Sequence, residues 1–347
     1  MSTEFGGDEG PVAFDRERAF SLRNDSFHLI LLPTEQCNFR CTYCYEDFSV
    51  GRMRPETVQG IKRLIDRRLV DLRLLHISWF GGEPLLAVNV IEDVSSHIMT
   101  AARSSLRYTG DITTNGYLLD TTMVDRLVAV GVRDFQISLD GPESVHDRTR
   151  VRADGRGSYR RLWQNLLAIR HSEAPITVVL RVHLTPVNLP TMPDFLTQIR
   201  NTFLDDTRFS VMLKPVERLG GPNDAIMDIL DKGSRSSTLA QLEAIVGGDG
   251  PAGRLPDSPV CYAARPNSLV IRANGMLGKC TVSLTHPAND LGRLCPDGTL
   301  QFRNDRLHPW LRGWETGDWD ALHCPADGFT LGEPTLLQIG PAPRRDA

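Results

Sequence analysis

The chain has 347 residues, of which 41% are hydrophobic and 24% charged, and its formal net charge is −4. This balance is ordinary for a globular protein with room for a substantial core, and no run of apolar residues is long enough to predict a membrane span. Because the charge is close to neutral, neither nucleic-acid binding nor membrane-surface binding is expected. Seven cysteines, three of them within eight residues, favour a reducing, cytoplasmic location over a disulfide framework.

Strand-like and helix-like segments alternate along the first two thirds of the chain. Apolar and β-branched runs predict strands at residues 27–32, 74–80, 106–113, 135–139, 176–184 and 209–213. Helical periodicity predicts a helix that begins near Arg54, with Pro55 in its first turn, and further helices at 89–102, 123–130, 159–170 and 195–201. Repeated strand–helix units argue for an α/β fold, a parallel sheet with outer helices.

After Pro215 the pattern changes. A Gly/Pro-rich linker at 219–223 precedes a short predicted helix at 238–246 and a β-hairpin, whose strands at 268–271 and 276–282 flank a type I′ turn at Asn274-Gly275. We therefore expect an N-terminal segment over 1–26, a main domain over 27–215 and a smaller C-terminal extension over 216–347. The first twenty residues and the tail after Gln338 are expected to be loosely ordered.

Cys37, Cys41 and Cys44 stand directly after the first predicted strand. Three thiolates on one tight loop can wrap one face of a soft-metal centre. A structural zinc site normally takes four ligands in two separated pairs, and a ferredoxin-type cubane takes four cysteines. Three thiols therefore predict a four-iron cluster with one iron left open to another ligand.

The spacing C-x3-C-x2-C, with an aromatic residue before the last cysteine, resembles the hallmark of the radical S-adenosylmethionine (SAM) enzymes. Further motifs of that superfamily follow in its order: Phe80-Gly81-Gly82-Glu83-Pro84, Thr113-Thr114-Asn115-Gly116, Ser138-Leu139-Asp140-Gly141-Pro142 and His146-Asp147-Arg148-Thr149-Arg150. The resemblance implies a partial (β/α)6, TIM-like barrel. Each motif follows the carboxyl end of a predicted strand, where α/β barrels place their active sites.

The resemblance also implies the cofactors, a [4Fe–4S] cluster and SAM, and a flavodoxin- or ferredoxin-type electron donor as a partner. Cys37, Cys41 and Cys44 would hold three irons, and reductive cleavage of SAM on the open iron would give a 5′-deoxyadenosyl radical. The positions that resemble SAM-binding residues of the superfamily are Tyr43 for the adenine, Gly81, Gly82 and Glu83 for the ammonium group, Asn115 as a ligand-facing amide, Ser138 and Asp140 for the ribose, and Arg150 for the carboxylate.

Some of these positions have simpler interpretations. Tyr43 also suits core packing, and Asn115 also suits a plain turn. Arg148 and Arg152 are alternatives to Arg150, because any of the three guanidinium groups can pair with a carboxylate.

Four neighbouring residues carry weaker signals. His146 and Asp147 are expected to brace their loop rather than to react. Arg181 and His183 lie two apart on the fifth predicted strand and therefore share one face, so that one of them is expected to line the pocket.

The C-terminal cysteines form a second, incomplete pattern. Cys261, Gly275 and Cys280 resemble the opening of the SPASM and twitch extensions, which hold auxiliary iron–sulfur clusters in radical SAM relatives. At the end of the pattern only Cys324 matches, and Asp327, Glu333 and Leu337 stand where further cysteines would follow. Two alternatives stay open: one auxiliary cluster on Cys261, Cys280 and Cys324, with Cys295 as a further thiol, or no such cluster. Cys280 is also a candidate catalytic residue, as a hydrogen-atom donor to a substrate radical, which excludes its being a ligand.

The activity implied by the resemblance is abstraction of a hydrogen atom from an unactivated carbon. The leading hypothesis is a ribosomally synthesised peptide substrate that is crosslinked or epimerised, because similar enzymes with a SPASM-type extension most often act on peptides. A small-molecule dehydrogenase or epimerase in sugar or aminoglycoside biosynthesis is the alternative. A non-catalytic iron–sulfur protein is the alternative of another class, although it has no use for the SAM contacts of Ser138, Asp140 and Arg150.

Overall fold

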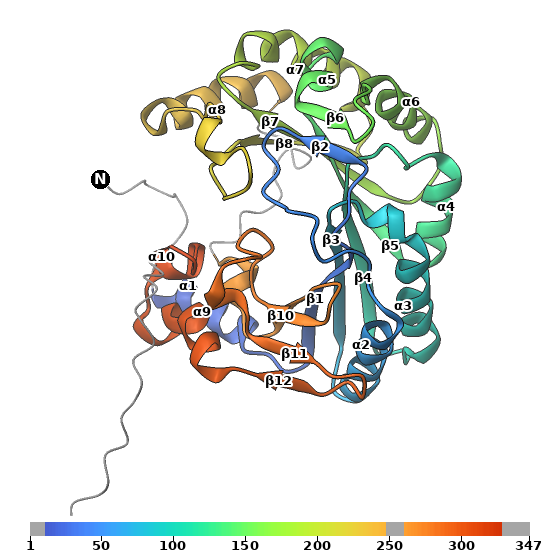
Figure 1. Ribbon diagram of the computed structural model, residues 1–347, viewed down its shortest axis with the longest axis vertical. Helices are drawn as coiled ribbons and strands as arrows, with labels where there is room; N and C mark the ends of the chain where they lie inside the picture. Colours follow the sequence, from blue (N-terminus) through green and yellow to red (C-terminus); the bar gives the residue numbers. More distant parts are fainter. Residues whose placement is uncertain (1–10, 248–259, 328–347) are drawn as a thin grey trace, which may run out of the picture.

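Six parallel strands form the centre of the molecule. The computed structural model describes residues 11–247 and 260–327, and Figure 1 shows the strands side by side with helices along one face of the sheet. The strands follow one another in chain order: β1 (Ser26–Thr34), β3 (Leu74–Gly81), β4 (Arg107–Thr114), β5 (Val132–Leu139), β7 (Thr177–Leu184) and β8 (Phe209–Pro215). All neighbouring pairs among them are parallel. The predicted α/β partial barrel is confirmed.

Helices cover the outer face of this sheet because each crossover between parallel strands returns on the same side. The crossover helices are α2 (Pro55–Arg68), α3 (Val88–Ala101), α4 (Thr121–Ala129), α6 (Tyr159–Arg170) and α7 (Met192–Phe203), and a short helix that was not predicted, α5 (Glu143–Thr149), precedes α6. Short 3₁₀ turns lie at Pro84–Ala87 and Leu189–Thr191. In α2, Pro55 stands in the first turn, as predicted, and the buried residues Val58, Ile61 and Leu64 face the sheet.

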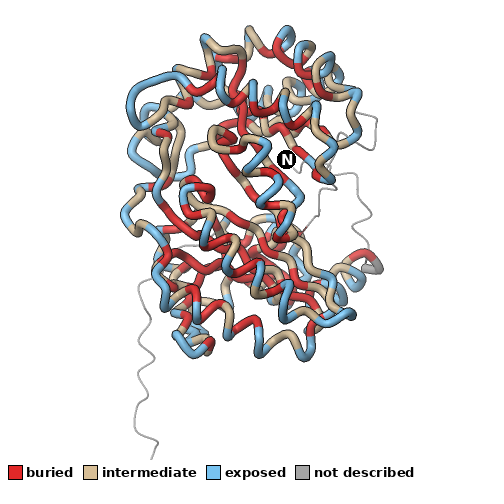
Figure 2. The backbone as a smooth tube through the Cα atoms, turned by 90° about the vertical axis from the view of Figure 1, so that its right-hand side faces the viewer, coloured by how far each residue is buried: buried red, intermediate tan, exposed pale blue. Residues whose placement is uncertain are grey.

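The two faces of the sheet differ in polarity. Leu75, Ile77 and Trp79 of β3 are fully buried, and Figure 2 shows buried residues running through the interior of the molecule. Because side chains alternate along a strand, His76 and Ser78 point to the opposite, inner face of the barrel. There both bond the carboxylate of Asp111 on β4, at 2.7 Å and 2.5 Å. The inner face of the barrel is therefore polar around Asp111, and the main apolar core lies between the sheet and the helices.

The C-terminal strands extend the same sheet. β9 (Ser268–Ile271) pairs in parallel with β1, and β10 (Met276–Gly278), β11 (Gly292–Leu294) and β12 (Leu300–Phe302) follow as antiparallel neighbours. The predicted hairpin is present as β9 and β10. The extension thus continues the sheet from the open edge of β1.

The predicted type I′ turn in this hairpin is wrong. A type I′ turn needs positive φ at both central residues, but here only Gly275 has one, +82°. The amide of Arg272 bonds the carbonyl of Met276 at 2.9 Å, which leaves a three-residue connection. The second strand also ends at Gly278, so that Cys280 lies beyond the strand on which it was expected.

The two ends of the described chain pack together. Helix α1 (Pro11–Ser21) places Phe14 against Trp314 of α9 (Asn304–Thr316), with ring centroids 5.8 Å apart, and against Trp319 of α10 (Trp319–His323), at 5.6 Å. Figure 1 shows α1 beside α9 and α10. The expectation of a loosely ordered N-terminus is therefore wrong for residues 11–20, and the tail after Gln338 lies outside the described residues.

The linker after β8 leads to α8 (Lys232–Val246), which is longer than the predicted helix because Asp231 caps its start by accepting the amides of Gly233 and Ser234. Further 3₁₀ turns lie at Asp224–Ile226, Tyr262–Ala264 and Pro287–Asn289. No helix of the described residues is both long enough and apolar enough to cross a membrane.

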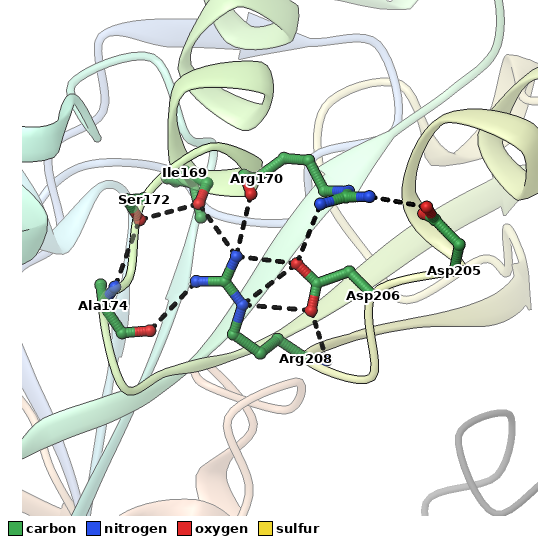
Figure 3. Close-up of polar contacts among 7 residues, drawn as sticks. All are labelled: Ile169, Arg170, Ser172, Ala174, Asp205, Asp206 and Arg208. Atoms are coloured by element: carbon green, nitrogen blue, oxygen red, sulfur yellow. Dashed lines mark hydrogen bonds and ion pairs between the residues drawn. The ribbon is translucent and has the colours of Figure 1, made fainter.

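Arg208 joins the end of α6 to the start of β8 (Figure 3). Its guanidinium donates to the carbonyls of Ala174 at 3.1 Å and Arg170 at 3.0 Å, and to the carboxylate of Asp206 at 2.7 Å. The hydrogen bond from Arg208 lowers the pKa of Asp206. This arginine therefore connects two elements at the amino-terminal end of the strands, opposite the carboxyl ends that carry the motifs.

Candidate functional site

The cysteine loop is held by a small second sheet. β2 (Phe39–Cys41) pairs antiparallel with β6 (Arg150–Arg152), so that Cys41 lies opposite Arg150. The amide of Thr42 bonds the carbonyl of Thr149 at 2.9 Å. The segment after α5 thereby fixes the loop over the carboxyl ends of the barrel strands. The sequence analysis missed this pairing because both strands have only three residues.

A cavity of about 270 Å³ opens between this loop and the strand ends. All three cysteines line it, and so do most of the predicted SAM-binding positions: Tyr43, Gly81, Gly82, Asn115, Ser138 and Arg150. Glu83 and Asp140 do not line it. Residues from the loop and from the ends of β3, β4 and β5 therefore meet at one place, as the motif positions predicted.

The thiols of the loop have the surroundings of cluster ligands. The amide of Phe39 donates to Sγ of Cys37 at 3.3 Å, and Nδ2 of Asn115 approaches the same sulfur at 3.9 Å. Burial raises the pKa of Cys37 and Cys41, and that of Cys44 to about 12. The thiols are therefore protonated in the absence of a cation, and iron binding has to displace these protons.

Cys37, Cys41 and Cys44 are the residues of this loop that could hold a cluster. In a four-iron cluster held by three cysteines each thiolate takes a different iron, and the fourth iron is left open to another ligand. Over residues 11–247 and 260–327, no three His, Cys, Asp or Glu side chains converge on a position for one ion.

The two glycines at the end of β3 permit close backbone contacts. A Cβ on Gly81, whose φ is +115°, would lie 2.4 Å from the carbonyl oxygen of Thr34, and one on Gly82 would lie 2.4 Å from that of Gln36. Any larger residue would push the end of β3 away from the start of the cysteine loop. The glycines thus serve the chain's own packing as well as the cavity wall.

Glu83 lies behind this wall. It is fully buried, and its carboxylate accepts the hydroxyl of Thr114 at 2.7 Å and the amides of Asn115 at 2.8 Å and Leu85 at 3.1 Å. Burial still raises its pKa, against these donors. The expected contact of Glu83 with a ligand's ammonium group is therefore not supported, and the carboxylate instead ties the end of β3 to the end of β4.

Asp140 also differs from the expectation. Ser138 and Asp140 were expected to point the same way, but β5 ends at Leu139 and the alternation of a strand does not extend further. The Asp140 carboxylate accepts the hydroxyls of Tyr43 at 2.9 Å and Thr149 at 2.6 Å. Both carboxylate oxygens of Asp140 therefore bond other side chains of the protein, and of the two residues only Ser138 lines the cavity.

A buried polar network surrounds this carboxylate. Nδ1 of His183 lies 3.2 Å from the carboxylate of Asp140, and Nη1 of Arg150 donates to the hydroxyl of Tyr43 at 2.7 Å. Burial alone would raise the pKa of Asp140, but the hydrogen bond with His183 and the charge of Arg150 hold it well below its usual value. Burial lowers the pKa of His183 to about 4, so the imidazole is neutral at pH 7.

Arg150 is the arginine that faces the cavity. Its guanidinium lies 5.7 Å from the ring centroid of Phe39, and its Nε is buried without a hydrogen-bond partner in the described chain. Arg148 is exposed, and Arg152 pairs with Asp154 at 2.7 Å. Among the three candidates, Arg150 alone therefore presents a free donor where a ligand carboxylate would bind.

The bracing roles predicted for the loop residues are present. The carboxylate of Asp147 accepts the amides of Ser158 at 2.8 Å and Tyr159 at 2.9 Å. His146 accepts the amide of Asp140 at 3.4 Å on Nδ1 and lies 3.1 Å from the hydroxyl of Ser158 through Nε2.

Other cavity residues were missed or only half predicted. Arg181 and His183 both line the cavity, whereas only one was expected. Tyr45, Lys214 and Glu217 line it as well. The sequence signal for Lys214 was its place at the end of the sixth predicted strand, but nothing in the sequence marks Tyr45 or Glu217.

Three of the C-terminal cysteines gather away from the cavity wall. Burial raises the pKa of Cys261, and the nearby thiols of Cys280 and Cys324 raise it further. Sγ of Cys280 accepts the amide of Val282 at 3.3 Å. Cys295 lies elsewhere, with its carbonyl against Gly60 of α2. Cys280 does not line the cavity, a placement that suits a ligand better than a hydrogen-atom donor.

Known proteins resemble this chain in sequence and in fold. Residues 31–199 match the Radical SAM superfamily. The GTP 3′,8-cyclase of Microcystis aeruginosa is 27% identical over 288 residues, which are 76% of this chain and 83% of that protein. The GTP 3′,8-cyclase of Tolumonas auensis is 34% identical over 134 residues, 38% of this chain and 37% of that one.

Solved structures show the same fold. Native anSMEcpe with bound AdoMet and a Cp18Cys peptide has a TM-score of 0.65 at 16% identity and covers 83% of this chain and 82% of its own. Streptococcus suis SuiB bound to S-adenosylmethionine has a TM-score of 0.52 at 15% identity, over 89% of this chain and 69% of its own. Identities this low establish the likeness of fold alone.

Proposed function

Because this chain carries a radical SAM domain and belongs to the radical SAM superfamily, we propose that it is an enzyme that cleaves SAM reductively and abstracts a hydrogen atom from a substrate. The observation that carries the proposal is the common cavity of Cys37, Cys41, Cys44 and the strand-end residues. A non-catalytic iron–sulfur protein would have no use for that cavity or for the unpartnered Nε of Arg150.

The superfamily uses a [4Fe–4S] cluster and SAM. When bound, they supply a 5′-deoxyadenosyl radical. Cys37, Cys41 and Cys44 would hold the cluster. The guanidinium of Arg150 would bind the carboxylate of SAM through two hydrogen bonds. Tyr43 holds this guanidinium in place, because its hydroxyl accepts a hydrogen bond from Nη1 of Arg150 at 2.7 Å.

Other wall residues hold the rest of the ligand. Asn115 and Ser138 present polar groups at the strand ends, and the ring of Tyr43 presents an apolar face for an adenine. Asp140 and His183 act through Tyr43, because both lie within 3.2 Å of its hydroxyl. They are positioning residues.

The C-terminal extension is proposed to be SPASM-like and to hold one auxiliary cluster on Cys261, Cys280 and Cys324. The support is that Cys280 and Cys324 both lie near enough to Cys261 to raise the pKa of its thiol, and that an amide bonds the sulfur of Cys280. In this proposal Cys280 is a ligand and not the hydrogen-atom donor. We also propose that the enzyme receives its electron from a flavodoxin- or ferredoxin-type protein and that it is cytoplasmic.

For the substrate we propose a peptide, which is modified by crosslinking or epimerisation. The support is the likeness to anSMEcpe and SuiB, whose structures were solved with bound peptides. A small-molecule substrate is the second candidate. It is favoured by the GTP 3′,8-cyclase relatives, of which one is matched over 83% of its length, and this shifts the small-molecule hypothesis from sugars towards nucleotides.

The activity is tested by reconstituting the protein with iron and sulfide under anaerobic conditions and adding SAM and dithionite. We expect 5′-deoxyadenosine, measured by liquid chromatography, and its loss in Cys41→Ala. Cys295→Ala is the matched control, because this residue does not line the cavity, and it should retain the product. Cluster-loaded protein that forms no 5′-deoxyadenosine would sink the proposal.

The substrate candidates are separated in the same assay. Consumption of GTP together with 5′-deoxyadenosine formation would favour the nucleotide. GTP left unchanged, with modification of a small peptide encoded beside the gene, would favour the peptide.

A further inference from the structure

Arg181 is a half-buried cation in the cavity wall to which the proposed SAM contacts give no role. It lies on β7, directly beside Ser138 of β5 in the sheet register, and its side chain lines the same cavity. Its Nε is buried and has no hydrogen-bond partner within residues 11–247 and 260–327. A buried N–H donor of a charged group is costly to leave unpaired unless an acceptor is supplied.

Two carboxylates near Arg181 are bonded to other residues. Glu217 bonds Lys214 and Arg235, both at 2.8 Å. The carboxylate of Asp140 accepts the hydroxyls of Tyr43 and Thr149. Burial is the largest influence on the pKa of Arg181 and lowers it, although the charge of Glu217 acts in the opposite direction.

Arg150 and Arg181 are separate donors. Arg150 bonds the hydroxyl of Tyr43 and lies opposite Cys41, at the cysteine loop. Arg181 extends from the barrel wall, next to β8. SAM has one carboxylate, which can bind Arg150. Arg181 is then available to bind another molecule.

The wall of β1 and β9 is apolar. Ile30, Leu32, Val270 and Leu284 form a buried cluster with which Phe80 and Tyr45 pack, and both of these aromatic residues also line the cavity. A molecule that fills the cavity beside SAM therefore meets an apolar surface and a cationic one.

We propose that Arg181 is the oxyanion-binding group of the substrate subsite, and that the substrate carries a carboxylate or phosphate group beside an apolar portion. This inference rests on the proposed function, because it takes SAM to occupy Arg150. A guanidinium fork binds either oxyanion through two parallel hydrogen bonds. A peptide with an acidic side chain or a free C-terminus meets this requirement, and so does a nucleotide.

The test uses the cluster-loaded full chain, saturated with SAM and kept without reductant so that no turnover occurs. Isothermal titration measures the binding of two probes, inorganic pyrophosphate and succinate. We expect saturable binding of at least one probe, weakened about tenfold or more in Arg181→Gln. Binding of pyrophosphate alone indicates a phosphate substrate, and binding of succinate alone indicates a carboxylate.

Two further variants keep the test specific. Arg181→Lys retains the charge and should bind more tightly than Arg181→Gln. Arg133→Gln removes an exposed arginine from β5 of the same sheet and should bind both probes as the unchanged protein does. Equal losses in the Arg133 and Arg181 variants would mean a general surface attraction and would overturn the inference, as would wild-type protein that binds neither probe.

The two proposals fail separately. If 5′-deoxyadenosine forms but folded Arg181→Gln, checked by circular dichroism, binds both probes normally, the oxyanion subsite is wrong and the radical SAM activity stands. If anion binding depends on Arg181 but no 5′-deoxyadenosine forms, the proposed function is wrong and Arg181 remains an anion site.

Discussion

The hydroxyl of Tyr43 lies between two opposite buried charges, those of Asp140 and Arg150. It donates to the carboxylate at 2.9 Å and accepts from the guanidinium at 2.7 Å. Each charge thereby keeps a hydrogen-bond partner without a direct ion pair, which is what makes their burial tolerable. Tyr43 also forms part of the cavity wall, so the orientation of a cavity residue depends in part on Asp140, which does not line the cavity.

His146 provides a test of this network at the scale of one residue. Burial lowers its pKa to about 4, so the folded protein keeps it neutral while an unfolded chain protonates it below about pH 6.5. The unfolded state then binds more protons between these pH values, and stability is lost as the pH falls through this window. The loss should reach up to about 3 kcal/mol at pH 4.

We expect His146→Gln to be less stable at pH 7 but to have a flatter stability profile from pH 7 to pH 4, measured by urea denaturation. His171→Gln, which removes an exposed histidine, is the control for the substitution itself. An unaltered slope in His146→Gln would show that another group causes the pH dependence.

At the scale of elements, the cysteine loop is held from two sides. On one side β2 pairs with β6. On the other, Glu35 at the start of the loop accepts the guanidinium of Arg272, which follows β9, at 2.5–3.2 Å, and the amide of Ala273 at 3.2 Å. Both charged side chains are buried. The C-terminal hairpin therefore fixes the base of the loop that carries the three thiols.

Arg272→Met should destabilise the protein by about 3–5 kcal/mol, because it leaves the carboxylate of Glu35 buried without its partner. Arg126→Met removes the exposed partner of Glu92 and should have a much smaller effect, because a solvent-exposed ion pair contributes little to stability. The free energy of unfolding in urea measures both. Equal effects of the two substitutions would contradict a structural role for the buried pair.

At the scale of the whole molecule, the second cysteine site depends on the packing of distant segments. Cys261 precedes a 3₁₀ turn at Tyr262–Ala264, Cys280 follows β10, and Cys324 ends α10. The amide of Cys261 bonds the carbonyl of Leu322 at 2.8 Å. This contact joins the first of these segments to the last.

If the auxiliary cluster exists, the reconstituted protein should bind about eight irons per chain, four for each cluster. Cys280→Ala should reduce this to about four, measured by iron analysis and by the cluster's absorbance, whereas Cys295→Ala should leave it unchanged. About four irons in the unchanged protein would rule out the auxiliary cluster without affecting the first site.

Much of the barrel was predictable because local patterns carry it. The β-branched run at 176–184 and the Pro55 helix start correspond to β7 and α2, since strand and helix periodicities act over a few residues. The resemblance to the radical SAM motifs singled out the cysteines and Gly81, Gly82, Asn115, Ser138 and Arg150. The rule that parallel strands end at the same edge of a sheet predicted that these motifs lie together. That rule places a residue at the edge but does not set the direction of its side chain.

The sequence by itself therefore determined that three thiols and a set of strand-end polar residues share one end of a barrel. Only the tertiary structure decided which of them face the cavity. Glu83 and Asp140 turn away because amides and hydroxyls from the neighbouring β4 and α5 segments supply better partners for a buried carboxylate than an open cavity does. Arg181 faces it without a partner because no acid on the adjoining strands is free, and a balance among residues so far apart in the chain cannot be seen in a local pattern.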